Sequence, residues 1–330
     1  MEFRRVDCKD CGAVKGESLS WTGNNGFYTK WFAYYVGKRC QNATIREVAD
    51  ELNLDWKTAK SMEMDYMREK YRRAGAPAPR VVGVDELSIR KGHNYRIVVS
   101  DLERKRPIWF GGKDRKEESL DLFWEELGPK KAEKVRLAVM DMWEAFENST
   151  VKNATQAAIL YDKFHVMRKL GEAMDVVRRS EYKNLPEEER KYIKGNRYIL
   201  LSHQRNLDLK GRRRLKVLLT ANKRLNAAYV LKESFGQLWD YQYPACALKF
   251  FDNWKSSLKG QKLVPYEKFA RTVERHWEGI VAHCKPENKV SLGFVEGLNN
   301  KIRVIQRRAY GLRDEEYLRL KVLTCTLENF

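Results

Sequence analysis

Two kinds of hydrophobic pattern divide this chain. Between residues 43 and 70, apolar side chains recur at the spacing of a helix face. Thr44 and Glu47 have the spacing of a capping box at a helix start, and Asp55 can cap a second helix after a tight turn at Asn53. Two short helices joined in this way predict a helix-turn-helix, although an ordinary helical hairpin would show the same pattern.

A linker that contains alanine and proline, residues 74–80, precedes a series of expected strands. The first three strands form an antiparallel meander, and a helix over 116–127 separates them from the last two. The expected strands are 81–89, 94–102, 106–112, 135–143 and 157–162. Three antiparallel strands followed by alternating helices and strands are typical of an RNase H-like sheet.

Helical patterns dominate the rest of the chain. From residue 163 to about residue 290 the sequence is rich in Arg, Lys, Trp and Tyr and shows no strand alternation, which predicts one helical domain. A final pair of helical segments follows over 291–323.

The charge of the chain points to a polyanionic partner. Its 330 residues include 64 Lys and Arg against 45 Asp and Glu, a net charge of +19. Enzymes for small metabolites rarely need this excess, whereas each nucleic-acid phosphate that a cation neutralises releases counterions. A solvated basic surface is the alternative. The sequence shows neither a run of apolar residues that could span a membrane nor the apolar core of a signal peptide, so we expect a cytoplasmic protein.

Three carboxylates stand out by their context. Asp85 interrupts the first expected strand, where an ionised group is costly unless a partner compensates it. Asp141 lies near the end of the fourth strand, where open α/β sheets place their ligand sites. Glu296 lies on a helix whose same face carries Asn300, Arg303 and Arg307. A carboxylate beside arginines suits a metal ion bound to a phosphodiester, and it equally suits a surface ladder of salt bridges.

Three carboxylates are a chemically sensible set for phosphodiester cleavage. The reaction needs an activated water and stabilisation of the departing oxyanion, and two divalent ions roughly 3.5–4 Å apart can supply both. Oxygen ligands without thiolates or several histidines favour Mg²⁺ or Mn²⁺ over zinc. Cys8 and Cys11 form a CxxC pair that could bind zinc, although no second pair lies beside it. The alternative is a turn with two reduced cysteines.

The chain contains four motifs in order, VDELSIRKGHNYRIVVSDLE, AVMDMWEAF, DKFHVMRKL and VEGLNNKIRVIQRRAYGLRDEEYLRLKVL. With these motifs it resembles the ISL3 family of bacterial insertion-sequence transposases, which belongs to the DDE class. The resemblance covers nearly all of residues 81–330, and the CxxC pair and the helix-turn-helix precede it in the expected order.

The resemblance implies that Asp85, Asp141 and Glu296 are the catalytic triad and hold two Mg²⁺ or Mn²⁺ ions. Asp162 and His165 resemble an accessory (C/D)xxH element, although a core histidine is the alternative for His165. Neighbouring strand residues point to opposite faces, so Glu86 should face away from the site and pair with Arg90 or Lys91.

The implied fold class is α/β, with an RNase H-like catalytic core interrupted by a large all-α insertion and preceded by a helix-turn-helix and a partial zinc-ribbon remnant. The expected domains are a partial zinc-knuckle segment at 1–37, the helix-turn-helix and linker at 38–80, the first part of the core at 81–165, the insertion at 166–290 and the second part of the core at 291–330.

The expected partners are DNA, both transposon ends and target, and a second copy of the chain in a synaptic assembly. When bound to DNA, the protein would be associated with the nucleoid. Candidate DNA contacts come from the second helix of the helix-turn-helix, from the cationic turn after the first strand and from the helix after Glu296. They are Lys57, Lys60, Arg90, Lys91, Lys301, Arg303, Arg307 and Arg308.

The expected activity is binding of terminal inverted repeats, hydrolysis that exposes 3′ hydroxyls, and joining of these to target DNA. The family's zinc-binding domain has an earlier cysteine pair, which this chain does not contain. A shortened transposase that acts as a non-catalytic DNA-binding regulator is therefore an alternative, and another RNase H-like DNA nuclease is a third.

Overall fold

The computed structural model describes the chain except residues 1–3, 17–18, 91–93, 184–186, 188–189, 191–193, 292, 310–311, 313 and 329–330. It forms two compact units. The first comprises Met1–Pro77, Arg106–Phe110 and Gly297–Phe330, and the second comprises Ala78–Lys105 and Gly111–Glu296. In the described part, no helix is both long and apolar enough to cross a membrane.

The first unit begins with a two-stranded hairpin, and three helices follow it. Their bounds are β1 Arg5–Asp7, β2 Val14–Gly16, α1 Lys30–Arg39, α2 Ile45–Glu51 and α3 Trp56–Ala74. Thr44 and Glu47 make the predicted capping box at α2. Asn53 has a φ of 51°, and Asp55 accepts hydrogen bonds from the first backbone N–H groups of α3. These local signals confirm the predicted pair of helices and its turn.

A small apolar core holds the helices α1, α2 and α3 together. Its buried residues are Val36, Cys40, Val48, Ala49, Ala59 and Met62. Gly37 of α1 lies so close to Tyr66 of α3 that an added Cβ would be 2.3 Å from the Cβ of Tyr66. The C-terminal helix α16, Glu315–Thr324, packs on α3 through Tyr317 and Leu320.

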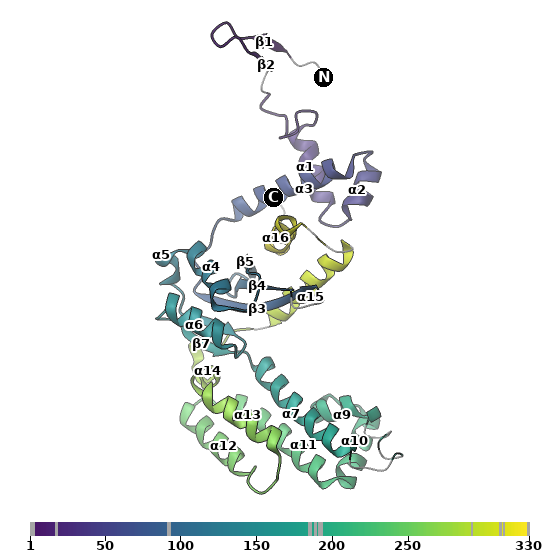
Figure 1. The fold of residues 1–330 in the computed structure, drawn as a ribbon, viewed down its shortest axis with the longest axis vertical. Helices are drawn as coiled ribbons and strands as arrows, with labels where there is room; N and C mark the ends of the chain where they lie inside the picture. Colours follow the sequence, from purple (N-terminus) through teal and green to yellow (C-terminus); the bar gives the residue numbers. More distant parts are fainter. Residues whose placement is uncertain are drawn as a thin grey trace. The chain divides into compact units, whose positions relative to one another are not determined.

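The next five strands form a mixed sheet, in the order β5-β4-β3-β6-β7. Figure 1 labels β3, β4, β5 and β7. The bounds are β3 Val81–Arg90, β4 Asn94–Asp101, β5 Arg106–Gly111, β6 Leu137–Met140 and β7 Ala158–Tyr161. β3 pairs with β4 antiparallel and with β6 parallel, and β6 pairs with β7 parallel. All five expected strands are therefore present. β6 is shorter than its expected range because the chain turns at Asp141, whose carbonyl accepts the Trp143 N–H.

Apolar side chains from the sheet and from the segment before Glu296 form a buried cluster. The cluster contains Val81, Leu137, Val139 and Leu160, and Phe294 and Val295 pack against it. The helices between β5 and β7 along the chain are α4 Glu117–Leu127, α5 Pro129–Ala132 and α6 Glu144–Asn153. The first of these confirms the helix expected over 116–127.

From Lys163 onward the second unit is helical, as expected: its described residues up to Val290 contain no strand. The long helices pack around buried aromatic residues such as Phe235, Trp254 and Phe269. The α-helices are α7 Lys163–Lys183, α9 Arg197–Leu201, α10 Leu209–Ala221, α11 Lys223–Phe235, α12 Pro244–Ser256, α13 Val264–Arg275 and α14 Trp277–Val281 (Figure 1). After them α15, Gly293–Arg308, begins with Glu296 in its first turn.

Candidate active site

The register of three parallel strands brings three aspartates into one row. Gly83 of β3 pairs with Val139 of β6, so two residues further on Asp85 and Asp141 are level with each other. Met140 of β6 pairs with Tyr161 of β7, so one residue further on Asp141 and Asp162 are level as well. Neighbouring strands lie about 4.7–4.9 Å apart. The carboxyl ends of β6 and β7 therefore present Asp141 and Asp162 beside Asp85.

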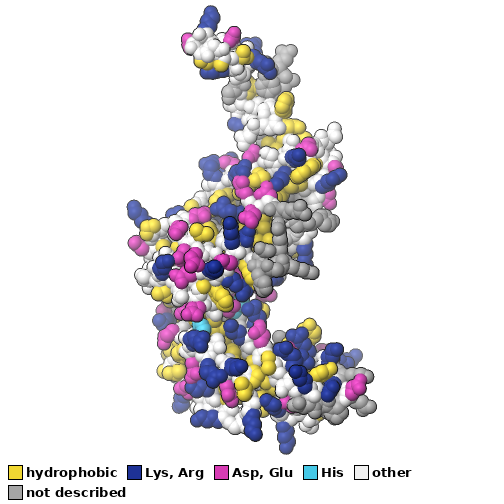
Figure 2. All heavy atoms as spheres, viewed as in Figure 1, with side chains coloured by type: hydrophobic (Ala, Val, Ile, Leu, Met, Phe, Trp, Pro, Cys, Tyr) yellow, Lys and Arg dark blue, Asp and Glu magenta, His cyan; other side chains and the backbone are white. Residues whose placement is uncertain are grey.

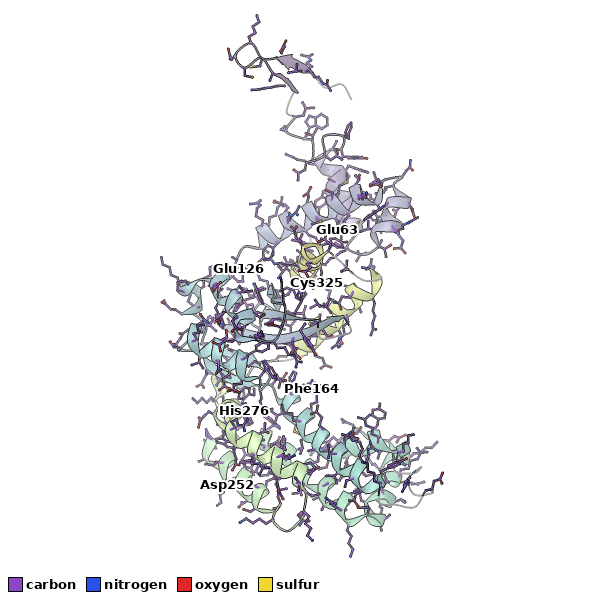
Figure 3. All side chains as sticks on the ribbon, viewed as in Figure 1. Glu63, Glu126, Phe164, Asp252, His276 and Cys325 are labelled. Atoms are coloured by element: carbon purple, nitrogen blue, oxygen red, sulfur yellow. The ribbon has the colours of Figure 1, made fainter. Side chains whose placement is uncertain are left out.

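Backbone N–H groups orient these carboxylates. Asp85 accepts the N–H of Glu86 at 2.7 Å, and Asp141 accepts the N–H of Met142 at 2.7 Å. Asp162 accepts the N–H of Phe164 at 2.8 Å in the first turn of α7, where Figure 3 labels Phe164. The three aspartates are half-buried. They are thus held at the sheet edge but still reachable from solvent.

Two cationic side chains from α7 contact Asp141. Its Oδ2 lies 3.3 Å from Nδ1 of His165 and 3.6 Å from a guanidinium nitrogen of Arg168. Nδ1 of His165 is buried, and it makes no well-aligned hydrogen bond within the described residues. The contact between Asp141 and His165 is therefore a close ion pair when the histidine is protonated.

The pKa shifts show that these groups act on one another. Burial raises the pKa of Asp162, and the neighbouring charges of Asp85 and Asp141 raise it further. Burial opposes the charge of Asp141, but His165 and the Met142 N–H outweigh it and lower the pKa of that carboxyl. For His165 burial again works against the charged form, yet the carboxylates raise its pKa. Several negative charges gathered at one place are typical of a site for a cation.

Glu296 comes from a different element, α15. It is exposed in the first turn of α15, directly after Phe294 and Val295, which pack on the sheet cluster. Among the described residues, no three His, Cys, Asp or Glu side chains are arranged to hold a metal ion. The structure therefore brings Asp85, Asp141, Asp162 and His165 together, and the place of Glu296 in the triad stays a prediction.

Glu86 has a different partner from those expected. It forms an ion pair with Arg115, whose guanidinium lies 4.3 Å from the ring centroid of Tyr95 and 5.4 Å from that of Trp143. Lys91 lies outside the described residues, and of Arg90 only the backbone is described. The expected pairing missed Arg115 because it is far from Glu86 in sequence. The contact of Arg168 was also missed, although its place three residues after His165 on a helix was a usable signal.

Of the eight predicted DNA contacts, six have described side chains, and these six fall into two groups. Lys57, Arg303 and Arg307 are exposed. Lys60, by contrast, pairs with Asp314 at 2.6 Å. Two more of these cations donate hydrogen bonds to backbone carbonyls. Lys301 donates to the carbonyl of Cys325, and Arg308 donates to that of Gln41. The exposed group retains cations that are open to a phosphate.

Cys8 and Cys11 lie in the turn of the β1–β2 hairpin. Cys8 accepts the N–H of Gly12 and donates its own N–H to Ala13. Backbone N–H groups of Cys11 and Asp10 lower the pKa of the Cys8 thiol, which favours the thiolate that a metal would need. Both thiols are free. A zinc ion at this pair stays a prediction.

Comparison with known proteins assigns the chain to a family. A family model described as transposase matches residues 82–322, and a model described as the helix-turn-helix domain of transposase family ISL3 matches residues 17–66. The chain belongs to the ISL3 family of transposases. The predicted helix-turn-helix is thereby confirmed, and membership of a DDE family implies the use of divalent metal ions.

Individual relatives agree with this assignment. The transposase for insertion sequence element IS1001 of Bordetella parapertussis is 34% identical over 97% of this chain and 79% of its own length. The transposase for insertion sequence element IS1557 of Mycobacterium tuberculosis is 25% identical over 96% of this chain and 76% of its own length. The likeness to both transposases thus extends over both units.

Proposed function

We propose that this ISL3-family transposase binds the terminal inverted repeats of its element, cleaves DNA strands there and joins the exposed 3′ hydroxyls to target DNA. The observation that carries the proposal is the row of Asp85, Asp141 and Asp162 across three neighbouring parallel strands. Carboxylates at the carboxyl edge of such a sheet lie where α/β enzymes bind their ligands.

The sheet supports an RNase H-like core. Numbered along the chain from β3, its strands lie in the order 3-2-1-4-5, with the second antiparallel to the first and the last two parallel to it. In this interpretation the helical residues 166–290 are an insertion, and residues 291–330 return the chain to the core.

The residues present are suited to a hard divalent cation. Asp85 and Asp141 offer oxygen ligands. Burial raises the pKa of Asp162, and the charges of Asp85 and Asp141, which a cation would offset, raise it further. In the proposed site Asp85 and Asp141 hold Mg²⁺ or Mn²⁺, with Glu296 as the third ligand. Bound divalent ions would activate the attacking water or hydroxyl and stabilise the departing oxyanion. His165 and Arg168 fix the direction of the Asp141 carboxylate.

The helix-turn-helix supplies the recognition of the element's ends in this proposal. The second of its helices, α3, presents exposed Trp56 and Lys57 at its N-terminus. The N-terminal residues of a recognition helix are those that reach base edges. Because an element has two ends, we propose that two copies of the chain act together.

The test is cleavage of a labelled duplex that carries the element's end, in Mg²⁺, by the wild type, by Asp85→Asn and by Glu86→Gln. The two variants each replace one carboxylate of β3 by its amide, and the side chains point to opposite faces of the sheet. We expect Asp85→Asn to lose on the order of a thousandfold or more in rate, while it still binds DNA. Glu86→Gln should stay within about tenfold of the wild type.

Equal cleavage activity of the wild type and Asp85→Asn would refute the assignment of Asp85 to the active site. Cleavage without joined products would instead indicate a hydrolytic nuclease. DNA binding without cleavage by the wild type would favour the regulator.

A further inference from the structure

A wide cleft crosses the helical part of the second unit. Its volume is about 1310 Å³, and residues of α7, α10, α11 and the segment 203–206 line it. One end begins at Lys163 and Met167 of α7, and Lys163 directly follows Asp162 of the candidate site. The same Lys163 also lines a second hollow, of about 580 Å³, beside Tyr161 at the end of β7. The cleft therefore leads away from the row of aspartates into the helical domain.

Cations dominate the lining of this cleft. They are Lys163, Arg205, Arg212, Arg213 and Lys216, against the acids Glu233 and Asp240. Glu233 is already neutralised, because it lies 2.7 Å from Lys232 and 3.3 Å from His203. Figure 2 shows Lys and Arg gathered over the region of α9 and α10. The cleft thus carries an excess of positive charge at the surface.

The fold itself does not account for this charge. The helix α10 contains Lys210, Arg212, Arg213, Arg214 and Lys216 and no acidic residue. Like charges three or four residues apart on a helix destabilise it by a few tenths of a kcal/mol per pair. Arg205, Arg213 and Lys216 are exposed, and the described part of the chain offers none of them a carboxylate within ion-pair distance. A bound polyanion would relieve the repulsion along α10.

The lining also indicates which part of a nucleic acid is bound. Apart from the cations, its exposed large apolar side chains are Leu209 and Val230, with 74% and 56% of their surface accessible. Of the aromatic rings that line it, Tyr229 is buried and His203 already lies 3.3 Å from Glu233. Binding of unpaired bases relies on exposed aromatic rings for stacking. This cleft instead offers point charges, which suit the phosphates of a duplex.

We propose that this cleft holds the sugar-phosphate backbone of the DNA duplex that adjoins the bond cleaved at the aspartate row. The inference rests on the proposed function, in which DNA occupies the candidate active site. It adds a DNA contact that is independent of base sequence. Arg205, Arg213 and Lys216 bind successive phosphates, and Lys163 binds the phosphate closest to the site.

The experiment compares two triple variants of the full chain. The cleft variant is Arg205→Gln, Arg213→Gln and Lys216→Gln. The matched control is Lys268→Gln, Arg271→Gln and Arg275→Gln, three exposed cations of α13 that do not line the cleft. Both variants remove three positive charges from the same unit. Thermal unfolding of each establishes that the fold is retained.

The first readout is binding of a short duplex of random sequence, followed by fluorescence anisotropy over a range of salt concentrations without divalent metal. Each lost phosphate contact lowers the slope of log affinity against log salt by about 0.9, so the cleft variant should lose a slope of up to about 2.7. Its affinity at low salt should fall at least about tenfold. The control should keep the slope and affinity of the wild type.

The second readout is a hydroxyl-radical footprint on an element end. The cleft variant should lose protection next to the cleavage position and keep protection over the repeat. Equal slopes for the two triple variants, or an unchanged footprint in the cleft variant, would overturn the proposal. Neither readout requires cleavage, so an inactive wild type would refute the proposed function and leave the cleft testable.

Discussion

At the scale of single residues, two adjacent carboxylates of β3 have different partners. Asp85 acts electrostatically on Asp162 and His165, whereas Glu86 pairs with Arg115. The alternation of a strand is the physical reason, because successive side chains point to opposite faces. A carboxylate that faces other carboxylates gains from a cation, and one that faces a guanidinium already has its partner. Position in the pleat, rather than residue type, thus decides which of the two faces Asp141 and Asp162.

Asp175 of α7 provides a residue-scale prediction about acid stability. Its carboxylate lies 2.8 Å from Arg178, 3.3 Å from Arg179 and 3.1 Å from Arg197 of α9. Burial works against its charge, but Arg178 and the other two arginines lower its pKa below the usual 3.8. A lowered pKa contributes stability that is present above 3.8 and lost as the pH falls through the folded-state value.

We therefore expect Asp175→Asn to lower the free energy of unfolding at neutral pH by about 2–4 kcal/mol, because Arg178 is left buried without its counter-charge. The difference from the wild type should shrink as the pH falls below 3.8. Urea unfolding at several pH values measures both effects. Glu172→Gln is the control, since its side chain is 70% exposed on the same helix. A deficit for Asp175→Asn that stays constant on acidification would contradict the ion-pair explanation.

At the scale of elements, the helix α14 approaches the end of β7 through a glycine. A Cβ on Gly279 would lie 2.4 Å from Cε2 of Tyr161, which is buried. Tyr161 in turn donates its hydroxyl to Glu147 and directly precedes Asp162. The packing of α14 therefore fixes the strand end from which Asp162 projects. Gly171 of α7, by contrast, has open space where its Cβ would be.

Replacing each of these two glycines by alanine should change the stability of the protein in opposite directions. Gly279→Ala must displace the Tyr161 ring or shift α14, which we expect to cost about 1–3 kcal/mol. Gly171→Ala lies inside a helix without a clash, and it should stabilise the protein by about 0.5–1 kcal/mol. Thermal unfolding monitored by circular dichroism measures both shifts. If Gly279→Ala is as stable as the wild type, the close approach of α14 to Tyr161 is not a real constraint.

The elements also show which features a sequence can predict. The capping box at Thr44, the turn at Asn53 and the cap at Asp55 depend on residues a few positions apart, so local pattern was sufficient. Part of the row of aspartates could also be predicted, because the end of a strand is visible in the local sequence pattern. The partner of Glu86 could not be predicted, because Arg115 comes from a distant segment whose position depends on the folded sheet.

At the scale of the whole molecule, the first unit joins the two ends of the chain. Glu63 of α3 is fully buried and bonds to Tyr317 and Lys321 of α16, more than 250 residues later. Figure 3 labels Glu63 on α3 and Cys325, the residue that follows α16. Burial raises the pKa of Glu63, and Lys321 and Tyr317 counteract this rise. The second helix of the helix-turn-helix, α3, is thus packed against α16.

The buried pair of Glu63 and Lys321 allows a test of how α3 and α16 are held together. Lys321→Met removes the cation and leaves a buried carboxylate, so we expect a loss of about 3–5 kcal/mol in the free energy of unfolding. Glu63→Leu together with Lys321→Met removes both charges and should cost clearly less than the sum of the single variants. Urea unfolding of the wild type, both single variants and the double variant completes the cycle.

Glu316→Gln is the matched control for the cycle. Glu316 also joins α16 to α3, through Arg68 at 2.6 Å, but its side chain is 57% exposed. Water already solvates that pair, so its loss should cost no more than about 1 kcal/mol. Strict additivity of the two core substitutions would show that Glu63 and Lys321 do not interact. Apolar packing of Tyr317 and Leu320 would then be what holds α16 on α3.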